Sequence, residues 1–144
     1  NQAMTGTGTT PLLVACEKGY AEVVRLLLAH SDTDVNRARI FDEATPLHTA
    51  CQQGHEAVVR LLLAHAASDV NRAMTGSRFT PLSMACYEGH EGVVRLLLEE
   101  GGTDQSQSAT EAALSVAEQA GHNGVVELLR QHTAELEAAE AEAK

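Results

Sequence analysis

Seven histidines and three cysteines are the side chains of this 144-residue sequence best suited to metal binding or catalysis. A zinc ion would take imidazole and thiolate ligands at about 2.0–2.3 Å. Equivalent positions in stacked helical repeats lie about 8–10 Å apart, so residues related by a repeat period cannot share one ion. We therefore predict no metal and no cofactor, and we expect structural histidines, some of them interacting favourably with helix dipoles. Six histidines fall in two equivalent positions of a repeated segment: His55, His90 and His122, and His30, His65 and His132.

The cysteines follow the same period. Cys16, Cys51 and Cys86 stand 35 residues apart, each directly after an alanine. The expected distance between repeats exceeds the limit of about 7 Å between Cα atoms for a disulfide, so buried free thiols are predicted. His48 lies three residues before Cys51 and could meet it on one helix, but a reactive thiolate needs an accessible, electropositive site. Since phosphate-binding loops and paired-carboxylate motifs are also missing, the sequence predicts a protein that is not an enzyme.

Near copies of one segment explain this periodicity. "TPLLVACEKGYAEVVRLLLAH" starts at Thr10, "TPLHTACQQGHEAVVRLLLAH" at Thr45 and "TPLSMACYEGHEGVVRLLLEE" at Thr80, and a divergent fourth copy reads "AALSVAEQAGHNGVVELL". A fixed period of this length indicates a solenoid. In the first three copies a threonine is suited to cap a helix, a proline to occupy its first position and a glycine to end it. The second helix is apolar nearly all round and too short to be stable alone, so neighbouring copies must bury it.

Composition narrows the possible partners and environments. Hydrophobic residues make up 44% of the chain, but aromatics only 3% and tryptophan is absent, so Leu, Val and Ala must build the core. A net charge of −10 without a basic stripe argues against nucleic acid as a partner. No apolar run approaches the roughly 18 residues that cross a bilayer, so we expect no membrane association. Reduced cysteines and the lack of a visible signal peptide favour an intracellular, cytoplasmic location.

The repeated segments resemble ankyrin repeats. "TPLHTA" at 45–50 matches the family's Thr-Pro-Leu-His-x-Ala line in full, and "GHEAVVRLLL", "GHEGVVRLLL" and the two "DVN" stretches also fit. The resemblance implies an all-α fold with β-hairpin-like loops, an ankyrin-repeat solenoid of stacked helix-turn-helix units. It places an ankyrin domain at 1–132, with units at about 10–44, 45–79 and 80–111 and a capping unit at 112–132. An acidic tail, expected to be a solvated helix end, occupies 133–144.

Both ends and the loops depart from the family pattern. The units are longer than the family's usual 33 residues, and the usual hairpin glycine is missing before Thr45, so the hairpin tips are expected to be less regular. Glu118 and Arg130 put polar groups where earlier copies have Cys and Leu, which is typical of a terminal cap. "NQAMTGTGTTPL" aligns with "NRAMTGSRFTPL", so we expect part of a longer array.

The first repeat has no preceding copy in this sequence. Four of its apolar residues are therefore expected to lack upstream cover: Leu12, Val23, Val24 and Leu27. We expect a monomer, with self-association through the uncovered first repeat as the alternative.

The resemblance implies a non-enzymatic module that binds another protein through its hairpin tips and the concave face of its first helices. Two alternatives stay open: a targeting or regulatory segment of a larger multidomain enzyme, and a structural or engineered scaffold. Phe41 and Phe79 could instead shield the next Thr-Pro-Leu corner. Positions that vary between copies on this face are the expected partner-binding residues. They are Arg37, Arg39, Ile40, Phe41, Asp42, Gln52, Gln53, Arg72, Met74, Arg78, Phe79, Met84, Tyr87 and Glu88.

Overall fold

A computed structural model describes residues 10–30, 33–38, 43–65, 68–74, 78–99 and 107–143, and within these ranges the chain forms eight helices and no strand. The all-α prediction is therefore confirmed. The helices are α1 (Pro11–Lys18), α2 (Ala21–Leu28), α3 (Pro46–Gln53), α4 (Glu56–Ala64), α5 (Pro81–Glu88), α6 (Glu91–Glu99), α7 (Gln107–Ala120) and α8 (Asn123–Ala143).

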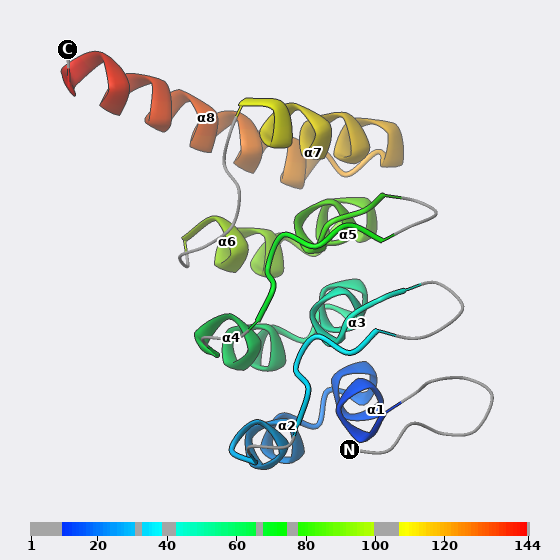
Figure 1. Ribbon diagram of the computed structural model, residues 1–144. Helices are drawn as coiled ribbons and strands as arrows, with labels where there is room; N and C mark the ends of the chain where they lie inside the picture. The colour runs from blue at the N-terminus through cyan, green and yellow to red at the C-terminus, as the bar shows by residue number, and fades with distance from the viewer. Residues whose placement is uncertain are drawn as a thin grey trace.

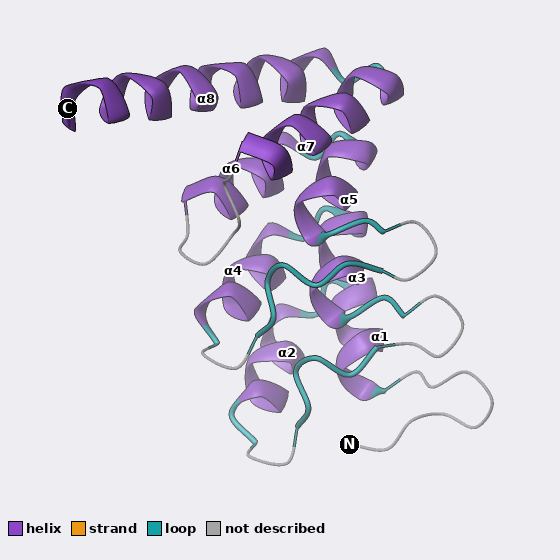
Figure 2. Cartoon of the chain, turned by 45° about the horizontal axis from the view of Figure 1, so that its top comes forward, coloured by secondary structure: helices purple, strands orange, loops and turns teal. Residues whose placement is uncertain are grey.

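The helices stack in two parallel columns, one helix pair above the next (Figure 1). The first helices, α1, α3, α5 and α7, contact one another in sequence, and the second helices, α2, α4, α6 and α8, form the other column. Each pair is joined by a tight turn, and the described arms of the loops between the first units lead out on the side of the first helices (Figure 2). This stacking is the solenoid that the repeat period predicted.

Local signals set the helix boundaries as expected. The Thr45 hydroxyl accepts a hydrogen bond from the backbone N–H of His48 at 3.3 Å, and the His48 Nδ1 accepts one from the N–H of Thr45 at 3.1 Å. This reciprocal capping box gives hydrogen-bond acceptors to two backbone N–H groups at the start of α3 that have none within the helix. At the other end Gly54 takes φ +75°, a left-handed conformation that costs glycine little, and so closes the helix.

The loop after the second unit has hairpin geometry. The backbone N–H of Met74 donates to the carbonyl of Phe79 at 2.9 Å, and the N–H of Arg78 donates to the carbonyl of Met74 at 2.8 Å. These bonds confirm a hairpin-like connection there. Arg78 and Glu43, equivalent residues in two successive loops, have φ values of 64° and 58°. Both residues thus have the left-handed backbone conformation that normally favours glycine.

Leucine, valine and alanine fill a continuous core, as the composition predicted. The three cysteines are buried free thiols, which confirms the prediction made for them. Burial raises the pKa of Cys16 and of Cys86 to about 12, and it raises the pKa of Cys51 further. Protonated thiols of this kind act as small apolar side chains.

The first unit leaves part of its second helix uncovered. Val23 is 44% exposed, whereas Val58 and Val93, which occupy the same position in the next two units, are each 1% exposed. Leu12 and Val24 are buried and belong to the core. The expectation that these two residues lack cover is therefore wrong, and the open face centres on Val23 and Leu26.

The last helix continues through most of the predicted tail. Helix α8 runs from Asn123 to Ala143, and its glutamates beyond residue 133 are exposed. Figure 2 shows this end of α8 extending past the stack. Among the described residues, no helix is both long enough and apolar enough to span a bilayer.

Candidate functional site

Histidine rings join adjacent units on the inner side of the turns. The His90 Nε2 donates to the carbonyl of Gln52 in the preceding unit at 2.9 Å. The same bond links His55 to Glu17 at 3.0 Å and His122 to Tyr87 at 2.9 Å. Each acceptor is a carbonyl near the end of the preceding first helix. These histidines therefore hold adjacent units of the solenoid together. Among the described residues there is no group of three His, Cys, Asp or Glu side chains arranged to hold a metal ion.

His48 has a different structural role. Its ring is fully buried, with Nδ1 accepting from the backbone of Thr45 and Nε2 donating to the carbonyl of Phe79 at 2.9 Å. Because both ring nitrogens are engaged, His48 has no free atom to take a proton from Cys51. The bond to Phe79 instead holds the base of the hairpin against α3.

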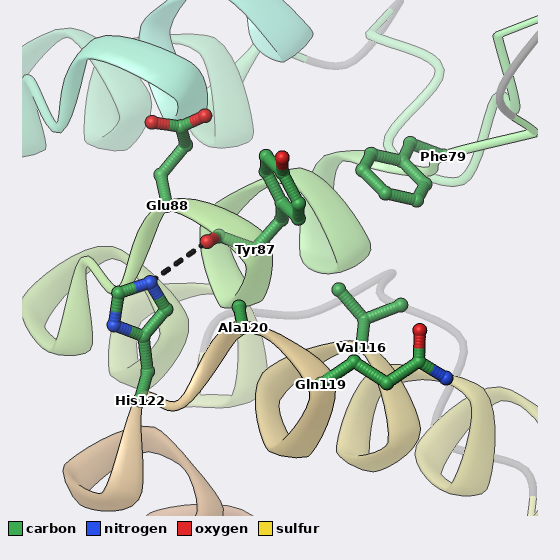
Figure 3. A pocket seen from close by; sticks show the side chains of 7 residues that line it. All are labelled: Phe79, Tyr87, Glu88, Val116, Gln119, Ala120 and His122. Atoms are coloured by element: carbon green, nitrogen blue, oxygen red, sulfur yellow. Dashed lines mark hydrogen bonds between the residues drawn. The ribbon is translucent and has the colours of Figure 1, made fainter.

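An open hollow of about 580 Å³ lies on the first-helix side between α5 and α7. Figure 3 shows its lining: Phe79 stands at the end of the loop before Thr80, Tyr87 and Glu88 come from α5, and Val116, Gln119, Ala120 and His122 come from the last unit. The Phe79 and Tyr87 rings are tilted at 52° with centroids 5.5 Å apart, a favourable aromatic arrangement. Helices α5 and α7, from adjacent units, are thus both needed to build this site.

The two aromatic rings differ in burial. Phe79 is half-buried and packs against the hydrophobic core, while Tyr87 is 50% exposed on α5. Phe79 therefore covers part of the core and also lines the hollow. Tyr87 presents most of the accessible aromatic surface.

Glu88 gives the hollow an acidic edge. It is the last residue of α5, where the aligned backbone carbonyls already create a partial negative charge. Among the described residues Glu88 forms no hydrogen bond or ion pair through its side chain, and it is the one formally charged residue lining the hollow. A cation at this edge would be favoured by both the carboxylate and the helix dipole.

The other predicted site residues lie apart from the hollow. Gln52 is half-buried and Gln53 exposed on α3, one unit away. Arg37 and Arg78 are exposed in the loops, and the half-buried Arg72 donates from Nη1 to the carbonyl of Asn36 at 3.1 Å. Four of the predicted residues, Arg39, Ile40, Phe41 and Asp42, lie outside the described residues.

Two methionines were expected on the surface, and that expectation is wrong. Met74 is 9% exposed and Met84 is 7% exposed, and both belong to the core. Met74 lies at the base of the hairpin, where its backbone N–H donates to the carbonyl of Phe79. Met84 lies on α5, which is flanked by α3 and α7, so neighbouring first helices cover it.

The last unit contributes residues that the sequence analysis did not select. Val116, Gln119, Ala120 and His122 complete the hollow. Aligning the divergent fourth copy on its Gly-His pair puts Gln119 in the position of Tyr87. The repeat register could therefore have identified Gln119 as a surface residue. That unit was interpreted as a cap, and its first helix was therefore left out of the predicted surface.

Comparisons with known proteins agree with this architecture. A family model described as ankyrin repeats in three copies matches residues 1–74 and 69–140. The crystal structure of the human ASB11 ankyrin repeat domain is similar, with 30% identity and a TM-score of 0.71. The alignment covers 85% of this chain and 53% of the solved one, so the chain spans about half the length of that domain. A search of curated proteins found no match. Ankyrin repeats are generally protein–protein interaction modules, and this chain belongs to the ankyrin repeat family.

Proposed function

We propose that this chain is a non-enzymatic protein-binding module whose partner places a large side chain in the hollow between α5 and α7. The observation that carries the proposal is the pair of Phe79 and Tyr87 at the edge of that hollow. Binding energy in protein interfaces concentrates on aromatic anchors that fill pockets. The first two units have Glu17 and Gln52 at the position of Tyr87, so the repeat fold itself does not require an aromatic ring there.

The residues best suited to chemistry support a binding role rather than catalysis. Burial raises the pKa of the cysteine thiols, which keeps them protonated and poorly nucleophilic at neutral pH. His55, His90 and His122 each use Nε2 to hold a neighbouring unit. The net charge of −10 favours a protein partner over a nucleic acid.

A matched pair of tyrosine variants tests the proposal. Tyr87 and Tyr20 are 50% and 56% exposed, but only Tyr87 lines the hollow. Partners would be purified from a lysate of the source organism with the parent, Tyr87→Ala and Tyr20→Ala, and the dissociation constant then measured by calorimetry. We expect Tyr87→Ala to weaken binding by about 30-fold, equivalent to about 2 kcal/mol for an anchor residue, and Tyr20→Ala to have little effect.

The folding of each variant must be checked by circular dichroism. If Tyr87→Ala is as stable as Tyr20→Ala and still binds every partner with the affinity of the parent, the hollow is not the binding site. The proposed location would then be wrong.

A further inference from the structure

We infer that the partner segment carries a lysine or, preferably, an arginine beside the large apolar side chain that enters the hollow, and that this basic side chain pairs with Glu88. The inference rests on the proposed function, because it concerns the chemistry of the segment bound at that site. It commits to one kind of occupant, an extended stretch of another protein with adjacent apolar and basic residues.

The hollow has two chemically different ends. Figure 3 shows Tyr87 between Glu88 on one side and Phe79 on the other, with Val116 below the aromatic rings. The Phe79 end offers an aromatic ring and a branched aliphatic side chain, which suits a leucine, methionine or aromatic residue. The Glu88 end offers a carboxylate. A segment that uses both ends must therefore combine an apolar and a cationic group.

The charge at the Glu88 end is uncompensated. Its carboxylate sits at the C-terminus of α5, where the helix dipole adds negative potential, and no basic residue occupies the last turn of that helix. Among the described residues Glu88 has no ion-pair partner. A guanidinium placed there would also reach the exposed face of Tyr87, where a cation–π contact adds to the attraction. These groups together favour arginine.

The repeat fold does not explain this carboxylate. The residues in the same position of the other units are Lys18, Gln53 and Ala120, which are basic, neutral and apolar. Each precedes the glycine that ends its helix, so the position accepts any of these side chains. A negative charge appears only where the aromatic pair is present. That coincidence favours a role in recognition.

A random peptide library displayed on phage tests the inference directly, since selection from it does not require the partner to be identified. Selection would use the parent, Glu88→Gln, Glu88→Lys and Tyr87→Ala, each checked for native helicity and melting temperature. The parent should enrich peptides with a large apolar residue within one or two positions of Arg or Lys. Glu88→Gln should lose the basic preference, and Glu88→Lys should replace it with Asp or Glu.

Affinities of one selected peptide make the test quantitative. An ion pair at the surface contributes roughly 0.2–1 kcal/mol, so Glu88→Gln should bind the selected peptide about 1.4- to fivefold more weakly than the parent does. The difference should be smaller at high salt. Replacing the basic residue of the peptide by glutamine should weaken binding to the parent by at least this factor. The same replacement should weaken binding to Glu88→Gln by less, because only the cation–π contact and the helix dipole are then lost. Fluorescence anisotropy would measure both.

Two failures can be told apart. If selection depends on Tyr87 but the enriched peptides are the same for the parent and Glu88→Lys, the charge pairing is refuted while the proposed binding site stands. If the parent enriches no peptide, or enriches peptides that bind Tyr87→Ala equally well, both the inference and the proposed function are refuted.

Discussion

Replacing Gly89 by alanine is expected to destabilise the protein by about 2 kcal/mol, whereas the same change at Gly121 is expected to cost about 1 kcal/mol. Both glycines end a first helix, and their φ values are +78° and +79°. The backbone penalty for a left-handed alanine is therefore the same at the two positions. What differs is the space around the added methyl group.

The methyl group at Gly89 would collide with a histidine. Its Cβ would lie 2.6 Å from Nδ1 of His122, whereas the Cβ at Gly121 would meet no heavy atom within 4 Å. Relieving the collision moves the His122 ring and breaks its 2.9 Å bond to the carbonyl of Tyr87. A typical hydrogen bond contributes about 0.5–1.5 kcal/mol, and this one is exposed, so we take a value near the lower end. The contact strain brings the extra destabilisation to about 1 kcal/mol.

Urea unfolding followed by circular dichroism at 222 nm would give both free energies, and a thermal scan should place Gly89→Ala several degrees below Gly121→Ala. A double-mutant cycle isolates the histidine: in a His122→Ala background, Gly89→Ala should cost only about as much as Gly121→Ala. Equal destabilisation at the two glycines in the parent background would show that the His122 ring does not stabilise the contact between the third and last units. The structural role assigned to the three turn histidines would then be wrong.

Single features of the structure lead to four other expected outcomes. Arg78→Gly and Glu43→Gly should each stabilise the protein by about 0.5–1 kcal/mol, because φ is positive at both positions; a loss of stability in urea unfolding would contradict the left-handed assignment. Burial raises the pKa of the three thiols, so unfolded thiols ionise before folded ones and the free energy of unfolding should fall between about pH 9 and 12. The slope should reach about 1.4 kcal/mol per pH unit for each thiol, and a triple cysteine-to-alanine variant should have a flatter profile. Val23→Lys should change the free energy of unfolding by less than about 0.5 kcal/mol and Val58→Lys by more than about 3 kcal/mol, because only Val58 is covered by a preceding unit. Similar effects of the two changes would mean that another element covers Val23. If that element is a second copy of the chain, sedimentation would reveal it. Glu88→Lys should stabilise α5 by roughly 0.3–1 kcal/mol through the helix dipole, and a destabilised variant in thermal unfolding would argue that the carboxylate has a structural role.

Most of the fold could be predicted from the sequence because its signals are local and repeated. Thr45 and Pro46 begin a helix and Gly54 ends it through capping, ring geometry and backbone freedom, none of which depends on distant residues. The apolar second helices required neighbours, and the period supplied those neighbours at regular distances. The same period predicted that the histidines would not converge on one ion, and it predicted the buried free cysteines that the structure shows.

The binding surface depended on contacts between units. Whether Met84 on α5 faces solvent is decided by how closely α3 and α7 approach that helix, and burial of Met74 depends on how the base of the hairpin packs against the core. The hollow likewise needs Tyr87 from one unit and Val116 from the next at a particular separation. The sequence by itself determined the repeat, the caps, the core composition and the identity of the variable positions. Only the tertiary structure decided which of those positions are accessible and adjacent, because side-chain exposure is set by the packing of neighbouring helices, which the spacing within one repeat does not encode.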